Sequence, residues 1–343
     1  MDDDRDVERV SLRAVAAAAG VSPSTVSRFL RGTLTLRGET LVAVERAIRR
    51  LGYVAPLRGP ARRTGLVGVV VPDLANAYYG TIAETVSASL RAQGRTALIV
   101  SARGATPADA DAVARLLALA PDGVLYLAER RRDPAVHRIA EARIPLVLVD
   151  EAVDGAGDAP RIAVADYSGG WQAVKHLVSL GHRRIAVATG PEDLSSVRER
   201  RRGWHDALLG AGLDPDAQLR YSGRYTEAFG YEVLSSIMSV DAAERPTAVF
   251  IGADEVALGA LTAARELGVH VPRDISVVSF DDVPAAAGTS PPLTTVRTPR
   301  GQLAERSVEV LMALLDGAPD EAAPSETLSV QLVVRESSGP PPR

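Results

Sequence analysis

The sequence predicts an α/β protein made of a small helix-turn-helix head and a larger two-lobed body built on parallel sheets. Charge is the first sign of this division, because residues 9–64 carry a net charge of +9 and residues 65–343 carry −9. The head region also shows the apolar spacing of three short helices. The body region alternates short Val/Ile/Leu runs with helical segments, which is typical of α/β folds. A basic head on an acidic body favours a module that binds a polyanion.

Composition excludes several classes of protein. Hydrophobic residues make up 46% of the chain and charged residues 24%, as in ordinary folded proteins. No apolar run approaches the ~18 residues of a membrane helix. The acidic leader, residues 1–9, has none of the features of a signal peptide, so we expect a cytoplasmic protein. The chain has no cysteine, and its 5 histidines show no metal-ligand spacing, so we expect no metal and no cofactor.

Residues 10–55 have the pattern of a three-helix DNA-binding head. Gly20 permits a left-handed turn between the first two helices. Ser22 is a predicted N-cap, and Pro23 begins the second helix, where its missing N–H costs nothing. A third helix follows at about 39–51. Such a second helix fits the major groove of DNA. Its apolar side chains are expected to face inward: Val26, Phe29 and Leu30.

The body is predicted to contain eight strands and eight helices. The strands are continuously apolar, as expected for parallel sheets that are covered on both faces. So many βα units would make one very wide sheet, which favours two lobes. The predicted strands are 66–71, 96–100, 123–127, 145–149, 161–165, 184–189, 247–251 and 275–280. The predicted helices are 78–93, 107–119, 134–142, 168–180, 197–211, 226–239, 254–267 and 299–316.

Carboxylates recur directly after the predicted strands. Ligands of parallel sheets bind beyond the carboxyl ends of the strands, so these positions predict the lining of a cleft. A lone Asp at such a place is more often a helix cap, but the set favours a site. Together with Arg200 and several tyrosines, the carboxylates suit a polyhydroxylated ligand. The strand-end positions are Pro72-Asp73, Asp150-Glu151, Asp166, Gly190-Pro191, Ala253-Asp254 and Asp281-Asp282.

The stretch LRAVAAAAGVSPSTVSRFLRG, followed by AIRRLGY, resembles the head of the lactose-repressor (LacI-type) family of bacterial transcription regulators. Its V-S-x-x-T-V-S-R core is the specific part of this resemblance. The similarity continues through VGVVVPDLANAYY, LVSLGHRRIAVATGP, TAVFIGADEVALGAL, VPRDISVVSFDDVP, SPPLTTVR and LVVRES. It implies a periplasmic-binding-protein-like body whose chain crosses three times between lobes. It also implies a two-fold homodimer on a palindromic operator.

The resemblance implies the following domains and contacts. The head (10–55) is followed by a linker (56–64) and an effector-binding and dimerisation domain (65–339). Its first lobe is expected at about 65–160 and 292–325, and its second at about 161–291 and 326–339. The implied DNA contacts are Ser22, Pro23, Ser24, Thr25, Ser27, Arg28, Arg31, Leu57, Arg58 and Arg62. The implied effector contacts are Asp73, Asn76, Tyr78, Tyr79, Asp150, Arg200, Tyr225, Asp254 and Asp281.

The chain departs from the family at four places, one of which is Arg37-Gly38, where relatives often have the Ser-Pro that starts the third helix. Ala253-Asp254 replaces the usual Asn-Asp, and Thr298-Pro299-Arg300 replaces side chains that line galactoside pockets, so we expect an effector that is not lactose-like. Gly59-Pro60 stands where relatives have a hinge helix, and Leu57 is the only apolar wedge candidate there. We therefore expect weaker coupling between effector and DNA. Arg28 is expected to contact guanine, with a phosphate contact as the alternative.

These observations favour a sequence-specific DNA-binding transcriptional regulator, a repressor whose operator binding is modulated by a small polar ligand, a sugar, in the cleft. The alternative is a solute-binding protein of transport type without a DNA role. That alternative requires an export signal and leaves residues 11–52 without a task. A third alternative is an enzyme acting on a sugar. Two adjacent acids, Asp281-Asp282, do not by themselves flank a scissile bond, so we expect no catalytic residues and no enzyme activity.

Overall fold

The computed structural model describes residues 12–30, 34, 36–51, 63–317 and 325–342 of the chain. The chain divides into two compact units, residues 1–62 and 63–343. The predicted acidic leader lies outside the described residues. So do most of the linker and four of the predicted DNA contacts: Arg31, Leu57, Arg58 and Arg62.

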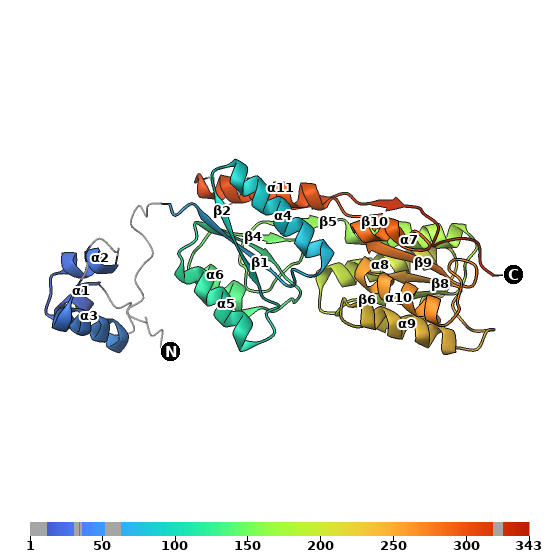
Figure 1. The fold of residues 1–343 in the computed structure, drawn as a ribbon, viewed down its shortest axis with the longest axis horizontal. Helices are drawn as coiled ribbons and strands as arrows, with labels where there is room; N and C mark the ends of the chain where they lie inside the picture. Colours follow the sequence, from blue (N-terminus) through green and yellow to red (C-terminus); the bar gives the residue numbers. More distant parts are fainter. Residues whose placement is uncertain (1–11, 31–33, 35, 52–62, 318–324, 343) are drawn as a thin grey trace, which may run out of the picture. The chain divides into compact units, whose positions relative to one another are not determined.

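The first unit contains a three-helix head (Figure 1). Its helices are α1 (Leu12–Ala19), α2 (Pro23–Leu30) and α3 (Gly38–Leu51). Gly20 adopts the predicted left-handed conformation, with φ at +67°, and the turn closes with a 3.1 Å hydrogen bond from the Val21 N–H to the Ala16 carbonyl. The three helices bury a small apolar core made of Val15, Ala16, Val26, Val44 and Ala47.

The second unit contains two six-stranded sheets, one in each lobe. The strand order is β11-β5-β4-β3-β1-β2 in the first and β12-β10-β9-β8-β6-β7 in the second. The pairs are parallel except that β12 runs antiparallel to β10. The strands are β1 (Leu66–Val71), β2 (Thr96–Ser101), β3 (Gly123–Leu127), β4 (Leu146–Val149), β5 (Arg161–Val164), β6 (Ile185–Thr189), β7 (Arg220–Ser222), β8 (Ala248–Ile251), β9 (Ser276–Asp281), β10 (Thr294–Arg297), β11 (Glu326–Leu328) and β12 (Gln331–Val333).

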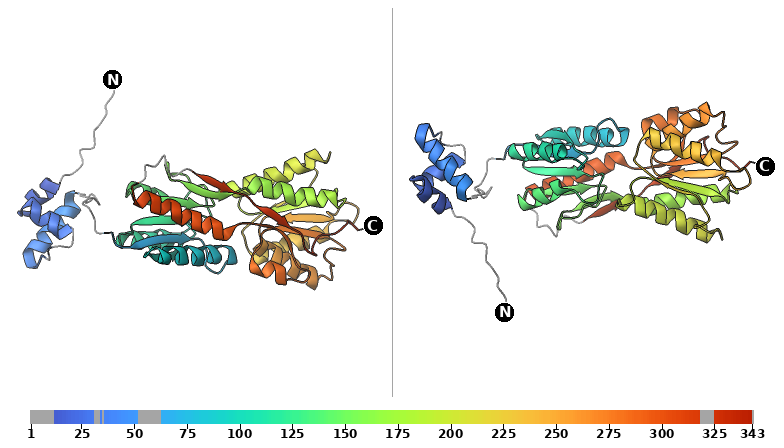
Figure 2. Two further views of the ribbon diagram at one scale, coloured as in Figure 1. Left: turned by 90° about the horizontal axis from the view of Figure 1, so that it is seen from above. Right: turned by 90° about the horizontal axis from the view of Figure 1, so that it is seen from below.

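Helices cover both faces of each sheet (Figures 1 and 2). In the first lobe, α4 (Ala77–Ala92) and α11 (Arg300–Leu315) pack on one face and α5 (Pro107–Ala118) and α6 (Pro134–Glu141) on the other. In the second lobe, α7 (Asp166–Ser179) and α8 (Ser195–Gly210) lie opposite α9 (Glu227–Ser239) and α10 (Asp254–Glu266). A short 3-10 helix spans Pro284–Gly288. This layering explains why the strands are apolar on both faces.

The eight predicted strands and eight predicted helices of the body are present, each within two residues of its predicted ends. The short strands β7, β10, β11 and β12 were not predicted. Three strands lie in the opposite lobe from the predicted boundaries. β5 and β11 belong to the first sheet and β10 to the second, because β5 pairs with β4, β11 with β5, and β10 with β9. The chain crosses between the lobes three times, after β5, after β10 and after β11.

Helices α9 and α10 approach closely through two glycines. A Cβ atom added to Gly230 would lie 1.7 Å from the Val256 carbonyl oxygen. A Cβ atom added to Gly259 would lie 1.8 Å from the Glu227 carbonyl oxygen. Both distances are far below van der Waals contact, so the two backbones lie this close only because neither position carries a side chain.

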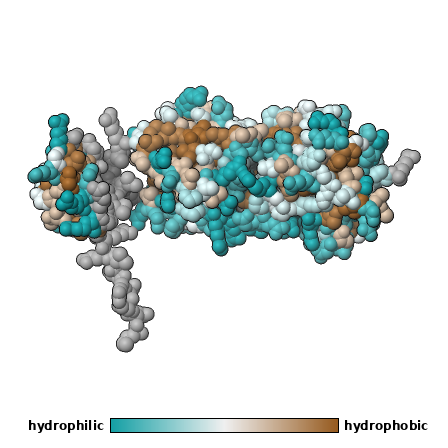
Figure 3. All heavy atoms as spheres, turned by 60° about the horizontal axis from the view of Figure 1, so that its bottom comes forward, coloured by the Kyte–Doolittle hydropathy of each residue, from teal (hydrophilic) through white to brown (hydrophobic). Residues whose placement is uncertain are grey.

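The first lobe exposes apolar side chains (Figure 3). Its edge strand β2 pairs with β1 on one side only. Ile99 on this strand is 40% exposed, and Leu74 and Leu119 of the same lobe are also exposed. Unpaired, apolar sheet edges are normally covered by another chain or segment.

Candidate functional site

The exposed face of α2 carries the predicted DNA contacts that the structure describes. Ser22 caps the helix, since its hydroxyl oxygen accepts a 3.1 Å hydrogen bond from the Thr25 N–H. The same hydroxyl lies 2.7 Å from the Ser24 hydroxyl. Ser22, Pro23, Ser24 and Arg28 are exposed, whereas Thr25 and Ser27 are half-buried. Val26 faces the core as predicted, and Phe29 packs against it. The result is a capped helix with a small, polar outer face.

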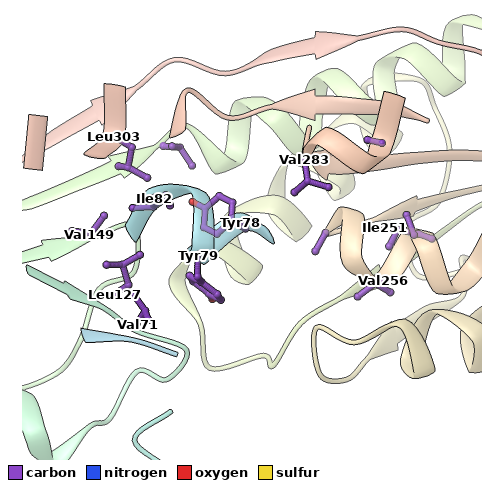
Figure 4. Close-up of a cluster of buried hydrophobic side chains, with 14 of the residues drawn as sticks. Val71, Tyr78, Tyr79, Ile82, Leu127, Val149, Ile251, Val256, Val283 and Leu303 are labelled. Carbon is purple, nitrogen blue, oxygen red and sulfur yellow. The ribbon is translucent and has the colours of Figure 1, made fainter. Parts of the chain in front are cut away.

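Two tyrosines at the start of α4 lie at the boundary between the lobes. The Tyr78 and Tyr79 rings meet edge to face, with centroids 5.3 Å apart. Figure 4 shows them between apolar side chains of the first lobe and Val283 of the second. The Tyr78 hydroxyl donates a 2.8 Å hydrogen bond to Asp150 Oδ2. Asp150 comes directly after β4 and has a left-handed backbone, with φ at +71°. Apolar side chains of the two lobes thus belong to one cluster here.

Arg200 is a buried cation of the second lobe. It lies on α8, and its Nε donates a 2.8 Å hydrogen bond to Asp166 Oδ1. Its Nη1 donates a 2.5 Å hydrogen bond to the Gly252 carbonyl. The guanidinium also stacks 3.7 Å from the centroid of the Phe280 ring. Burial raises the pKa of Asp166, although Arg200 acts in the opposite direction. These contacts fix the guanidinium in one place.

Asp281 and Tyr225 are two more of the predicted effector contacts in the second lobe. Asp281 ends β9 with φ at +113°, and its carbonyl accepts a 3.1 Å hydrogen bond from the Thr298 hydroxyl. Burial raises the pKa of its carboxyl well above the usual range, despite the opposing charge of Arg200. The Tyr225 ring lies against Gly190, where an added Cβ would sit 2.3 Å from the ring. Glycine at that position leaves room for the ring.

Three buried side-chain oxygens of this region lack a hydrogen-bond partner among the described residues: Asp150 Oδ1, Thr189 Oγ1 and the Tyr225 hydroxyl. The Nε of Arg300, whose guanidinium contacts the Asp281 carbonyl, is also buried without a partner there. Buried polar groups are normally satisfied, and leaving one unsatisfied costs about 1–3 kcal/mol. The three atoms follow β4, end β6 and precede α9, so they come from both lobes. Such an arrangement suits a ligand that both donates and accepts hydrogen bonds, as hydroxyl groups do.

Comparison with known proteins gives matches for both units. Residues 11–55 match the family described as bacterial regulatory proteins, lacI family, and residues 174–338 match a periplasmic binding protein-like domain. The HTH-type transcriptional regulator MalR of Streptomyces coelicolor is 35% identical over 341 residues, covering 96% of this chain and 97% of MalR. The chain belongs to the lacI family of bacterial regulatory proteins.

Two solved structures of lacI-family proteins resemble this one over nearly its whole length. A complex of the transcriptional regulator CelR with cellobiose has a TM-score of 0.74 and 33% identity, covering 96% of this chain and 100% of that one. A lac repressor dimer bound to operator and an anti-inducer has a TM-score of 0.69 and 29% identity, covering 97% of this chain and 100% of that one.

Membership of the lacI family confirms the predicted fold class and the prediction of a DNA-binding transcriptional regulator that is not an enzyme. It also excludes the alternative of a transport protein without a DNA role, because the relatives match the head as well as the body. None of the helices in the described ranges is long and apolar enough to span a bilayer. No group of three or more potential metal ligands occurs among the residues described.

Three of the predicted effector contacts have structural tasks in this lacI-family member. Asp254 accepts hydrogen bonds from the Ser279 hydroxyl, the Thr295 hydroxyl (2.7 Å) and the Val283 N–H (2.8 Å). Both of its oxygens therefore accept hydrogen bonds from within the second lobe. Asn76 caps α4 by accepting a 2.9 Å hydrogen bond from the Tyr78 N–H. Asp73 pairs with Arg103 and supports the turn before α4.

Two strand-end acids make structural contacts that were not predicted from the sequence. Glu151 and Asp166 belong to the strand-end pattern, but neither was assigned a contact. Asp166 holds Arg200, and Glu151 accepts hydrogen bonds from Ser195 and Ser196 at the start of α8. The sequence contains only an indirect signal for this contact of Glu151. The helix it contacts begins after Leu194, which has no polar side chain to serve as its own N-cap.

Proposed function

We propose that this regulator is a repressor that binds a palindromic operator as a homodimer, and that an uncharged sugar in the interlobe cleft modulates this binding. It would act in the cytoplasm, where its DNA is. The observation that carries the proposal is the set of unpartnered, buried hydrogen-bonding atoms contributed by both lobes: Asp150 Oδ1, Thr189 Oγ1 and the Tyr225 hydroxyl. A ligand that satisfies them contacts both lobes at once.

The outer face of α2 supports the DNA contact. Ser22, Pro23 and Ser24 are exposed at its start, and Arg28 is exposed one turn later. Short serine side chains let the helix backbone approach base edges, and arginine is the side chain that most often contacts guanine. We propose that Arg28 reads a base, that Thr25 and Ser27 line the same face, and that the net charge of +9 over residues 9–64 attracts the phosphates.

The charge of the cleft supports an uncharged ligand. Asp150 and Asp281 come from opposite lobes, both are buried, and Arg200 is already engaged by Asp166. An anionic ligand would bring a negative charge next to these two acids, whose pKa burial raises because buried surroundings disfavour the charged form. Hydroxyl groups of a sugar donate to carboxylates, and Tyr78, Tyr79 and Tyr225 offer aromatic surface. The CelR–cellobiose complex makes cellobiose the first sugar to test.

The exposed edge of the first sheet supports a dimer. Strand β2 has one free side, and Ile99 on it is 40% exposed. A second copy of the chain would cover this apolar edge and place two heads on one palindrome. The relative solved on its operator is a dimer. Light scattering should therefore give twice the 36.1 kDa chain mass, and Ile99→Asp should shift the protein toward monomer. A wild-type monomer would contradict this part of the proposal.

Selection of bound duplexes from a random pool tests the DNA function. The purified full chain is used at two salt concentrations, because nonspecific phosphate binding weakens steeply with salt. We expect one palindromic sequence to be enriched at both. Salt-sensitive binding without an enriched sequence would contradict specific recognition, and no binding at either salt would contradict the DNA function.

A thermal-shift panel tests the ligand class. We expect cellobiose or another uncharged disaccharide to raise the melting temperature and to change affinity for the selected operator. Cellobionate and lactobionate, the aldonic acids of disaccharides, serve as anionic probes of similar size and should give no shift. Stabilisation by either anion and by no neutral sugar would overturn the assignment of an uncharged ligand.

A further inference from the structure

Helix α8 begins without an N-cap from its own lobe. Its N-cap residue, Leu194, is apolar and buried, and no side chain of that residue accepts a hydrogen bond from the first turn. The first N–H groups of a helix have no partners within the helix, so a buried helix start needs an outside acceptor. This helix matters for the site because it carries Arg200 at the end of its second turn.

The missing cap comes from the opposite lobe. Glu151 follows β4 of the first lobe and is only 4% exposed. Its Oε2 accepts hydrogen bonds from the Ser195 N–H (2.9 Å) and the Ser195 hydroxyl (2.6 Å). Its Oε1 accepts hydrogen bonds from the Ser196 N–H (3.3 Å) and the Ser196 hydroxyl. In return, the Ala152 N–H of the first lobe donates a 3.2 Å hydrogen bond to Ser195 Oγ.

These contacts suit a carboxylate in particular. A negative charge at a helix N-terminus interacts favourably with the helix dipole, and hydrogen bonds to an ionised group are stronger than neutral ones. No cation is needed, because N–H and O–H donors surround both oxygens. Separation of the lobes would break every one of these bonds at once and would leave the start of α8 uncapped.

We propose that Glu151 is a positioning residue that holds the cleft closed in the absence of effector by capping α8 from the other lobe. Glu151 is adjacent to Asp150 in the chain, and α8 carries Arg200, so the cap sets how these two effector-site groups face each other. Glu151 itself has its oxygens occupied by α8 and makes no effector contact. The proposal rests on the proposed function only for the statement that this cleft is the effector site.

The interlobe distance gives a test that needs no effector. Because the chain has no cysteine, Asp111→Cys on α5 and Glu232→Cys on α9 place one spin label on each lobe. Both positions are exposed. The two single-cysteine variants identify any distances that arise between subunits. We expect the doubly labelled protein without sugar to show one narrow distance distribution, that of the closed cleft.

Glu151→Gln should then add a second, longer distance. Loss of charge-assisted hydrogen bonds at a buried site changes an equilibrium about tenfold or more, so the open-to-closed ratio should rise by at least that factor. Glu192→Gln is the matched control. It removes an exposed acid near the same helix that pairs with Arg201 of its own lobe at 2.6 Å, and it should leave the distribution unchanged.

The double variant Ser195→Ala/Ser196→Ala provides an independent route to the same result. It removes the two hydroxyl donors but keeps the carboxylate and the backbone N–H groups, so it should open the cleft to a smaller extent. Circular dichroism confirms that each variant is folded. A folded Glu151→Gln protein with the wild-type distance, or a wild-type protein that is already open without sugar, would overturn the proposal. A lack of sugar binding would not affect it.

Discussion

Replacement of Tyr225 by phenylalanine should stabilise the free protein and weaken its ligand binding. The Tyr225 hydroxyl is buried and has no hydrogen-bond partner in the described part of the chain. Burial also raises the pKa of this phenol, so it is uncharged at neutral pH. Its removal takes away one polar group that the folded state leaves unsatisfied. It also takes away one group that a ligand hydroxyl would contact. The two effects have opposite signs.

The magnitudes follow from the burial of this hydroxyl. An unsatisfied buried hydroxyl costs about 1–3 kcal/mol, so the free energy of unfolding of Tyr225→Phe should exceed that of wild type by about 1 kcal/mol. A neutral hydrogen bond to ligand contributes about 0.5–1.5 kcal/mol, so affinity for the ligand should fall roughly threefold to tenfold. Gly190, which accommodates the ring, is unaffected because the ring itself is kept.

Urea unfolding without ligand and calorimetric titration with cellobiose measure the two effects. Tyr231→Phe is the control, since the Tyr231 hydroxyl already has a partner, Glu266 Oε2 at 3.0 Å, and lies outside the cleft. Loss of the Tyr231 hydroxyl should lower the free energy of unfolding slightly or not at all. If Tyr225→Phe is less stable than wild type, its hydroxyl has a partner in the free protein. The reasoning from unsatisfied groups to a ligand site would then be wrong.

Three further predictions concern other parts of the molecule. Arg28→Ala should flatten the sequence preference in duplex selection if Arg28 reads a base; an equal loss for all sequences would mean a phosphate contact. Gly230→Ala should lower the free energy of unfolding by about 3 kcal/mol because α9 and α10 must separate, whereas Gly210→Ala, with nothing within 4 Å, should not. Burial raises the pKa of Asp254 to about 6, so the folded state keeps a proton that the unfolded state loses, and stability falls as pH rises from about 4 to 6. Urea unfolding at pH 4.5 and 7.5 should show about 2 kcal/mol of this dependence in wild type that Asp254→Asn lacks.

The regular part of the fold was predictable because its signals are local. Continuous apolar runs such as 66–71 and 123–127 mark strands buried on both faces, and the structure places strands at these same residues. Helix starts are also encoded locally. Thr106 and Asp109 form a capping box before α5, and the predicted helix began at the same residue, Pro107.

The short strands were not predictable in the same way. β10 and β12 have only four and three residues, and β10 contains two threonines. They form strands because β10 pairs with β9, and β12 pairs with β10. Pairing of this kind depends on tertiary neighbours that no short sequence window contains. The same cause explains the error in the lobe boundaries. The sequence of β5 predicts a strand, but which sheet the strand joins depends on the strands that pair with it.

The acids of the cleft show what a strand-end pattern does and does not determine. The pattern located seven carboxylates, but the task of each depends on which donors the other elements bring to it. Asp254 is surrounded by donors of its own lobe, Asp166 by a guanidinium, and Glu151 by a helix start of the opposite lobe. Asp150 keeps an unpartnered oxygen, and burial raises the pKa of Asp281 well above its usual range. These two acids belong to different lobes. A sugar that donates a hydroxyl hydrogen bond to each would therefore stabilise the closed cleft further, in addition to the cap that Glu151 provides.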